Sequence, residues 1–189
     1  MKEIRTNKPL RILLVTNAMI LMAGGLLGPI YALFVEEIGG DLLDAGIAGF
    51  VFAIAAGITV VISGKKSDAS KHPEYIVALG YCIMGAGYLL YLFVHSMTSL
   101  LLVQVLIGFG EALYLPAFDA LYSIHLDKNN EGGEWGEWES MNYFATAAAA
   151  LIGGFVAEKH GFILLFLMMS LLCLLSGLYT QELLHGKRK

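Results

Sequence analysis

Apolar residues follow one another along this chain in long runs that are separated by short polar connections. A helix that spans the hydrocarbon core of a bilayer needs about 20 mostly apolar residues. Six runs come close to or exceed that length, at 10–35, 45–63, 74–94, 98–124, 140–157 and 161–184. The connections leave no room for a separate soluble domain. The pattern therefore predicts an all-α membrane protein, a single domain of six transmembrane helices over residues 1–189.

The composition agrees with this pattern and narrows the chemistry. The chain is 57% hydrophobic and 15% charged, whereas soluble domains carry about 25% charged residues. Cys82 and Cys173 lie inside apolar runs, which argues against a disulfide framework or a cysteine-based metal site. Neither H-E-x-x-H nor G-x-S-x-G occurs. We therefore expect membrane lipid as the surroundings, with no enzymatic activity, metal, cofactor or nucleic-acid partner.

The distribution of basic residues predicts the orientation. Six crossings place both termini on one side, and a cytoplasmic location of that side leaves Lys159 as the one basic residue outside. The inside residues are then Lys2, Arg5, Lys8, Arg11, Lys65, Lys66, Lys71, Lys128, Lys187, Arg188 and Lys189. Such a bias is the positive-inside rule. We expect cytoplasmic N- and C-termini in a prokaryotic cytoplasmic membrane, and residues 125–139 as a cytoplasmic loop with Trp135 and Trp138 at headgroup level.

The two halves of the chain resemble each other. With their prolines aligned, GPIYALF at 28–34 matches LPAFDAL at 115–121, an offset of 87 residues. ISGKKSD at 62–68 and IGGFVAE at 152–158 both place a carboxylate four residues after a glycine, at an offset of 90. Coincidence is the alternative, since both patterns are common. Because three crossings are an odd number, the halves run in opposite senses, which predicts two inverted three-helix repeats at about 10–94 and 98–184.

Three stretches carry a resemblance to a known family. In GKKSDASKHP at 64–73, Gly64 and Asp68 match a loop signature of glycine, three residues and aspartate, whereas Ala69 and Lys71 stand where that signature has arginine and glycine. The fourth run is similar in Gly108, Gly110, Pro116 and Ala117, with Gln104 where an arginine often stands, and 150–162 is similar to a glycine-rich fifth helix. The chain resembles one half of a major facilitator superfamily transporter.

The resemblance implies a fold and an assembly. The family usually has about twelve crossings in two parallel halves, so six crossings imply a half-size transporter that completes its pathway as a symmetric homodimer. The signature loop, Gly64, Lys65, Lys66 and Asp68, is expected to hold the cytoplasmic helix ends together and to gate transport. The alternatives are a non-transporting scaffold, one subunit of a heteromeric transporter, and a piece of a longer transporter.

Small residues at four-residue spacing mark two helix surfaces for close packing. They are Gly49, Ala53 and Gly57 in the second run and Ala145, Ala149 and Gly153 in the fifth. In the resembled fold the second and fifth helices form the contact between the halves, so we expect both stripes at the dimer interface. The alternative is that they pack within one bundle.

Polar residues assign the first and fourth runs to a central cavity. Asn17 and Tyr31 share one face of the first run, and the glycines before Pro29 favour a local break there. On the fourth run one face carries Glu111, Tyr114, Phe118 and Tyr122, with Gln104 further out and Asp119 about 80° around the helix from Glu111. A charge at the bilayer centre costs about 2.5–3.5 kcal/mol, so these carboxylates are not expected to face lipid.

These residues lead to a hypothesis about function. Glu111 is expected to couple protons or bind a cation, and for Asp119 both a functional role and a packing role are open. For both, the alternative is a neutral carboxyl that is hydrogen-bonded to a neighbouring helix. Two copies of Glu111 among aromatic residues suit a cationic, partly apolar substrate. We therefore expect a secondary active transporter that exports cationic amphiphilic compounds in a proton-coupled manner.

Overall fold

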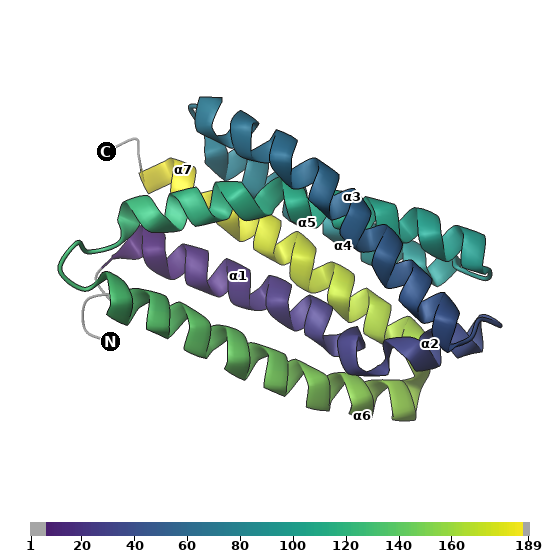
Figure 1. The fold of residues 1–189 in the computed structure, drawn as a ribbon. Helices are drawn as coiled ribbons and strands as arrows, with labels where there is room; N and C mark the ends of the chain where they lie inside the picture. Colours follow the sequence, from purple (N-terminus) through teal and green to yellow (C-terminus); the bar gives the residue numbers. More distant parts are fainter. Residues whose placement is uncertain (1–6, 187–189) are drawn as a thin grey trace.

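The computed structural model describes residues 7–186, and this part of the chain is helical, without strands. The elements are α1 (Lys8–Leu27), η1 (Gly28–Ile30), α2 (Tyr31–Glu37), α3 (Leu42–Ala69), α4 (Pro73–Leu90), η2 (Tyr91–Phe93), α5 (Met97–His125), α6 (Glu131–Thr180) and α7 (Glu182–Gly186). Long helices run back and forth beside one another (Figure 1). In residues 7–186, five helical segments are long and apolar enough to cross a membrane.

The fifth of these segments is much longer than a bilayer is thick. α6 has 50 residues, about 75 Å at the α-helical rise, whereas the hydrocarbon core measures about 30 Å. Gly161 interrupts it with φ 74° and ψ −178°, a conformation open to glycine. In Figure 1 the green part of α6 and the yellow part run in opposite directions. We call residues 131–160 the first arm and residues 162–180 the second arm.

The two prolines within apolar runs act differently. Pro29 lies in the 3-10 turn η1, which separates α1 from α2, so the predicted local break is confirmed. Pro116 lies inside α5, which continues from Met97 to His125 without interruption. Proline removes one backbone donor in either place. The difference is that Gly28 precedes Pro29 and is open, with no atom within 4 Å of a Cβ placed there, whereas α5 is packed on both sides.

Close backbone contacts define the packing. α1 packs on α6, α3 on α5, and α4 on both α5 and α6. A Cβ at Gly153 would collide with the carbonyl oxygen of Leu26, and one at Gly108 would lie 2.6 Å from the carbonyl oxygen of Phe52. Such approaches between helices need glycine. They fix the first arm of α6 on α1 and fix α3 on α5.

The helices differ in how much of their surface the bundle covers. α5 is the most buried, with residues such as Leu100, Ala117 and Phe118 fully enclosed. α3 buries only Ala48, Ser63 and Ser67. Its other side presents an apolar surface, with Phe50 65% and Ile58 64% exposed. α3 is therefore an apolar helix attached to the bundle along one edge.

The two ends of the bundle have different contacts. At one end Asn7 Nδ2 donates to the His125 carbonyl oxygen at 2.8 Å, and Lys8 Nζ lies 3.6 Å from Glu182 Oε2. We call this the terminal end, since α1 begins and α7 lies there. At the far end Phe34 packs on Tyr91 and Phe166, with ring centroids 5.5 and 4.9 Å away. The far end is thus held by aromatic packing.

The expected loop over residues 125–139 is wrong in its second half. α6 begins at Glu131, in spite of three glycines in its first two turns. Glu134 Oε2 accepts from the Asp127 amide at 2.8 Å, and Trp135 packs on Tyr122 with ring centroids 4.8 Å apart. These contacts outweigh the cost of glycine, which is roughly 1 kcal/mol each. Trp135 and Trp138 are accordingly half-buried against the bundle.

Candidate functional site

A pocket of about 320 Å³ lies between α1, α3, α4 and α5. We call it the Glu111 pocket. Its polar lining residues are Glu111, Gln104, Tyr31, Tyr88 and Tyr91, and its other walls include Gly24, Gly28, Gly49 and Phe52. Three of the residues expected from the sequence, Glu111, Gln104 and Tyr31, thus come together although 80 positions separate Tyr31 from Glu111.

A hydrogen-bonded amide organises one wall of this pocket. Gln104 Nε2 donates to the Tyr31 hydroxyl, and the Tyr91 hydroxyl donates to Gln104 Oε1 at 3.4 Å. Gln104 is 6% exposed, so both ends of its amide need partners inside the protein. The three side chains come from α5, α2 and η2. This network fixes two tyrosine rings at the pocket and ties the first, third and fourth apolar runs together.

Glu111 lies at the edge of the bundle and is only partly buried. Within residues 7–186, its carboxylate has no hydrogen bond within 3.5 Å and no ion pair within 4.0 Å. Tyr88 and Tyr114 are close enough to interact with it electrostatically. A carboxylate without these partners is available to take up a proton or to bind a cation.

The other aromatic residues expected on the cavity face lie in the core. Tyr114 packs on Tyr81 with ring centroids 4.7 Å apart, and Phe118 stacks on Tyr122 at 5.9 Å. The Tyr122 hydroxyl donates to the Glu134 carbonyl oxygen at 2.7 Å. None of these three expected residues, Tyr114, Phe118 and Tyr122, lines the Glu111 pocket. Helical periodicity places them on one face with Glu111, but α4 covers Tyr114 and α6 covers Tyr122.

Asn17 and Asp119 also lie away from the Glu111 pocket. Asn17 is 2% exposed, and its Oδ1 accepts from Trp138 Nε1 at 3.1 Å, so it joins α1 to the first arm of α6. Asp119 is partly buried and near Tyr81. The hydrogen bond between Asn17 and Trp138 therefore holds two helices together.

Two aromatic residues of the Glu111 pocket were not expected from the sequence. Tyr88 and Tyr91 come from the end of α4 and from η2. Their rings stack with centroids 6.1 Å apart. The signal available was a pair of tyrosines three residues apart at the end of an apolar run, where amphipathic rings usually mark the membrane interface. Only the three-dimensional packing distinguishes the two roles.

Comparison with known proteins decides the family. The family model described as the Major Facilitator Superfamily matches residues 13–185. The chain belongs to this superfamily. It is accordingly a multi-pass membrane protein of a transporter family rather than of an enzyme family, as the sequence predicted.

Several curated relatives are similar to this superfamily member. The uncharacterized MFS-type transporter YitZ of Bacillus subtilis (strain 168) is 26% identical over 160 residues, 85% of this chain and 97% of the relative. The multidrug resistance protein MdtG of Enterobacter lignolyticus (strain SCF1) is 26% identical over 172 residues, which are 89% of this chain and 41% of the relative. The uncharacterized MFS-type transporter MJ1560 of Methanocaldococcus jannaschii is 22% identical over 189 residues, which are 98% of this chain and 49% of the relative. The chain spans nearly the whole length of the first relative and less than half of the other two.

The signature loop of the superfamily lies at the end of α3. Gly64 is near Pro116, with 3.9 Å between its Cβ position and the proline Cβ. Lys65, Lys66 and Asp68 are exposed on the last turns of the helix. In the part of the chain that the structure describes, no ion pair to Asp68 occurs. Asp68 thus pairs with neither Lys65 nor Lys66 in residues 7–186, and the gating role of the loop stays a prediction.

The two small-residue stripes have different surroundings. Gly49, Ala53 and Gly57 on α3 are exposed, and the Cβ positions of both glycines are open. On the first arm of α6, Ala149 is fully buried and lies 2.9 Å from the Cβ position of Gly25. Its stripe neighbours Ala145 and Gly153 are also buried, with Gly153 against Leu26. The second stripe thus packs on α1 of its own chain, so its expected place in a dimer interface is corrected.

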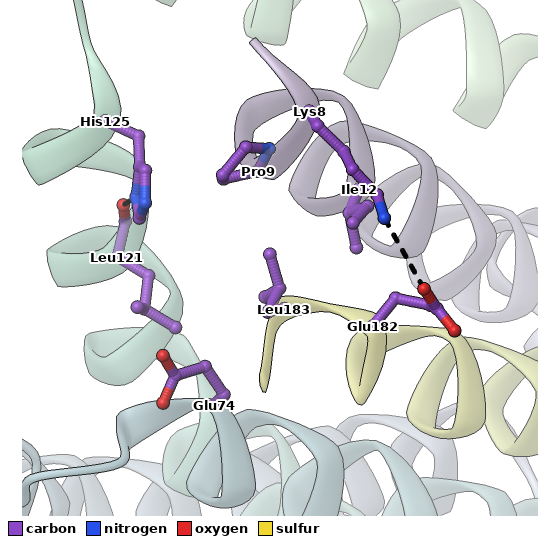
Figure 2. A pocket seen from close by; sticks show the side chains of 8 residues that line it. All are labelled: Lys8, Pro9, Ile12, Glu74, Leu121, His125, Glu182 and Leu183. Carbon is purple, nitrogen blue, oxygen red and sulfur yellow. Dashed lines mark hydrogen bonds and ion pairs between the residues drawn. The ribbon is translucent and has the colours of Figure 1, made fainter. Parts of the chain in front are cut away.

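A different pocket, also of about 320 Å³, lies at the terminal end (Figure 2). Lys8, Glu182 and His125 stand on its walls, and Glu74, 1% exposed, lies at its base. His125 Nδ1 is 2.7 Å from the Leu121 carbonyl oxygen. The partners Lys8 and Glu182 are about half exposed, so this ion pair adds little to stability. Leu121, the lining residue of this pocket nearest to Glu111 along α5, is ten residues from it, about 15 Å along the helix.

Proposed function

We propose that this chain is a half-size secondary active transporter that exports cationic amphiphilic compounds in exchange for protons. Two copies pair symmetrically in a cytoplasmic membrane of a prokaryote, with their termini in the cytoplasm. Glu111 of each copy lies in the central cavity and couples the proton to the substrate. Gln104, Tyr31, Tyr88 and Tyr91 shape the binding surface around it.

The two arms of α6 support six crossings. The first and second arms have 30 and 19 residues (131–160 and 162–180), about 45 and 29 Å. Each is long enough to cross a hydrocarbon core of about 30 Å, the first with its start outside the core. Their opposite directions in Figure 1 return α7 to the end at which α1 begins.

Reciprocal packing supports the inverted repeat. α1, the first helix of one repeat, packs on the first arm of α6, which is the second helix of the other repeat. α5, the first helix of the second repeat, packs on α3, the second helix of the first. The third helices, α4 and the second arm of α6, pack on each other at Gly85, whose Cβ position lies 3.2 Å from Cys173 Cβ. A two-fold axis between the repeats produces this exchange of partners.

The observation that carries the proposal is the position of Gly49. This residue belongs to the exposed stripe of α3 and also lines the Glu111 pocket. A second copy seated on the stripe would cover the pocket and bring its own Glu111 towards the same space. The first arm of α6 adds exposed apolar residues for a partner or for lipid, among them Tyr143 at 74% and Leu151 at 78%. The stripe stays in the proposed interface, whereas Ala145, Ala149 and Gly153 do not.

The lining of the pocket suits an organic cation. Glu111 supplies negative charge, and the faces of Tyr31, Tyr88 and Tyr91 offer cation–π contacts of about 0.5–2 kcal/mol each. Protonation of Glu111 would remove the attraction and release the cation, so a proton and the substrate compete for one group. The similarity to a relative that is named a multidrug resistance protein favours this substrate class.

Export by purified protein in vesicles tests this proposal. Ethidium is loaded into proteoliposomes, and its proton-driven efflux is followed by fluorescence. Glu111→Gln is expected to lower the coupled rate at least tenfold, because a neutral amide neither titrates nor attracts the cation. Asp119→Asn is the matched control, since Asp119 lies outside the pocket, and it is expected to retain most of the activity. Equal rates for wild type and Glu111→Gln would refute the role of Glu111.

The mass of the purified protein separates the proposal from its rivals. A self-sufficient homodimer has twice the chain mass of 20.5 kDa. A monomer that transports nothing alone would instead favour a subunit that needs a different partner half. A stable dimer that fails to transport any cation would favour a scaffold.

A further inference from the structure

A third pocket lies at the far end, apart from Glu111. We call it the far-end pocket, and its volume is about 470 Å³. It forms where three connections meet, namely the end of α2, the link from η2 to α5, and the turn between the arms of α6. Its main lining residues are Phe34, Glu37, Tyr91, His95, His160 and Phe166. Of these, only Tyr91 also lines the Glu111 pocket.

The floor of the far-end pocket is a cluster of aromatic rings. Phe34 contacts Phe162 and Phe166, with ring centroids 5.4 and 4.9 Å away. Tyr91 contacts Phe166 at 5.0 Å. Three of these residues, Phe34, Tyr91 and Phe166, are at most 4% exposed, so the floor is anchored in the core. Fixed aromatic rings of this kind accept apolar groups and can hold a cation over their faces.

The rim of the far-end pocket is acidic. Among the described residues that line the pocket, Glu37 is the one carboxylate, and none is a lysine or an arginine. Within residues 7–186 Glu37 forms no ion pair. Lys159, which directly precedes the lining residue His160, pairs with Glu158 at 3.8 Å. His95 and His160 complete the rim as exposed imidazoles. A carboxylate above an aromatic floor selects an organic cation over an anion.

Tyr91 connects the two pockets. Its ring forms part of the aromatic floor, and its hydroxyl donates to Gln104 Oε1 at 3.4 Å in the Glu111 pocket. Gln104 in turn donates to Tyr31. A ligand that displaces Tyr91 would therefore disturb the amide that shapes the Glu111 pocket. Tyr91 therefore lies between the far-end pocket and the Glu111 pocket.

We propose that the far-end pocket is a second binding site for organic cations, with the charged group at Glu37 and the apolar part on Phe34, Phe162 and Phe166. As a station on the export route it rests on the proposed function, because it lies at the end opposite the start of α1 and opposite α7. Its binding chemistry stands on the pocket itself. The cation is either the exported compound or the ammonium group of a membrane lipid.

Binding of tetraphenylphosphonium to the full chain in detergent tests the site. Equilibrium dialysis is expected to give two molecules bound per wild-type chain. Glu37→Gln should weaken one of these about fivefold, whereas Glu36→Gln, an exposed neighbour outside the pocket, should bind like wild type. Phe162→Leu should weaken the same molecule, and Phe93→Leu, a 68% exposed ring outside the pocket, should not. Identical binding by Glu37→Gln and Glu36→Gln would overturn the proposal.

Glu111→Gln in the same assay separates this inference from the proposed function. If Glu111→Gln loses one bound molecule of tetraphenylphosphonium and Glu37→Gln loses the other, the far-end pocket and the proposed function are both supported. A single molecule that depends on Glu111 and not on Glu37 refutes the far-end pocket and leaves the proposed function intact. Binding that depends on Glu37 and is unchanged by Glu111→Gln supports the far-end pocket and refutes the proposed role of Glu111.

The lipid composition assigns the source of the cation. The assay is repeated in nanodiscs of phosphatidylglycerol alone and of phosphatidylglycerol mixed with phosphatidylethanolamine. Loss of the Glu37-dependent molecule in the mixed lipid would show that the lipid ammonium occupies the pocket. Retention in both would assign it to the exported compound. Either result supports an organic-cation site, and absence of Glu37-dependent binding in both lipids contradicts it.

Discussion

α3 and the first arm of α6 carry the same sequence pattern and use it differently. Both have three small residues at four-residue spacing on an apolar helix. On α6 that stripe is buried against α1, where Gly153 meets the backbone of Leu26. On α3 the stripe is exposed, and the Cβ positions of Gly49 and Gly57 are open. The pattern indicates a surface for close packing, but it does not indicate the partner.

The difference follows from what each helix has beside it. α3 is fixed on α5 at Gly108 and through Ser63, whose Oγ donates to the Ala112 carbonyl oxygen. Its stripe makes no such contact, since nothing lies within 4 Å of the Cβ positions of Gly49 and Gly57. The first arm of α6 is fixed on α1 through the stripe itself. One stripe therefore stabilises the chain, and the other is available for a second copy.

The largest expected effect is on the buried stripe. Gly153→Leu should destabilise the chain by about 3 kcal/mol or more, because the new side chain meets the backbone of α1 and neither helix can yield. Size-exclusion chromatography after heating is expected to show loss of the folded species well below the wild-type temperature. A wild-type melting curve for this variant would mean that α1 and α6 are not packed as described.

The matched change on the open stripe should leave the fold intact. Gly57→Leu has space for its side chain and is expected to melt like wild type. It should weaken the proposed homodimer at least tenfold, since a leucine would hold two helices apart at the stripe. Dilution series by light scattering or single-molecule photobleaching measure this. Unchanged dimerisation would exclude this stripe from the interface.

The smallest effects concern two serines that hold helices in place. Ser63 Oγ donates to Ala112, and Ser176 Oγ donates to the Thr16 carbonyl oxygen at 2.7 Å. Each alanine variant should lose about 0.5–1.5 kcal/mol of stability. Ser63→Ala should also speed hydrogen exchange in α3 alone, because α3 packs mainly on α5, whereas Ser176→Ala should act across the bundle. Equal and uniform exchange in both variants would contradict the separate attachment of α3.

The sequence predicted the helices well because long apolar runs have few alternatives. The expected run at 98–124 agrees with α5 at Met97–His125, and the run at 74–94 agrees with Pro73–Phe93. The break before Tyr31 was also predictable, since glycine and proline stand together there. Family membership followed from motifs even though Ala69 and Lys71 depart from them.

The faces of the helices were harder to predict, because periodicity defines a face but not its neighbour. Tyr114, Phe118 and Tyr122 share a face of α5 and are buried, with Tyr114 against α4 and Tyr122 against α6. Glu111, at the margin of that face, lines a pocket whose tyrosines come from α2, α4 and η2. The early start of α6 was missed for a similar reason, because the contacts of Glu134 and Trp135 with distant residues override three glycines.

Cross-linking through α3 tests the central claim most directly. Ala53→Cys and Leu178→Cys are introduced separately into a chain with Cys82→Ser and Cys173→Ser, and each protein is oxidised in lipid vesicles. Ala53 lies on the open stripe, whereas Leu178, 62% exposed, lies on the second arm of α6. A covalent dimer of Ala53→Cys alone is the result that we predict. Monomers from both proteins, or equal dimer yields from both, would contradict pairing through α3.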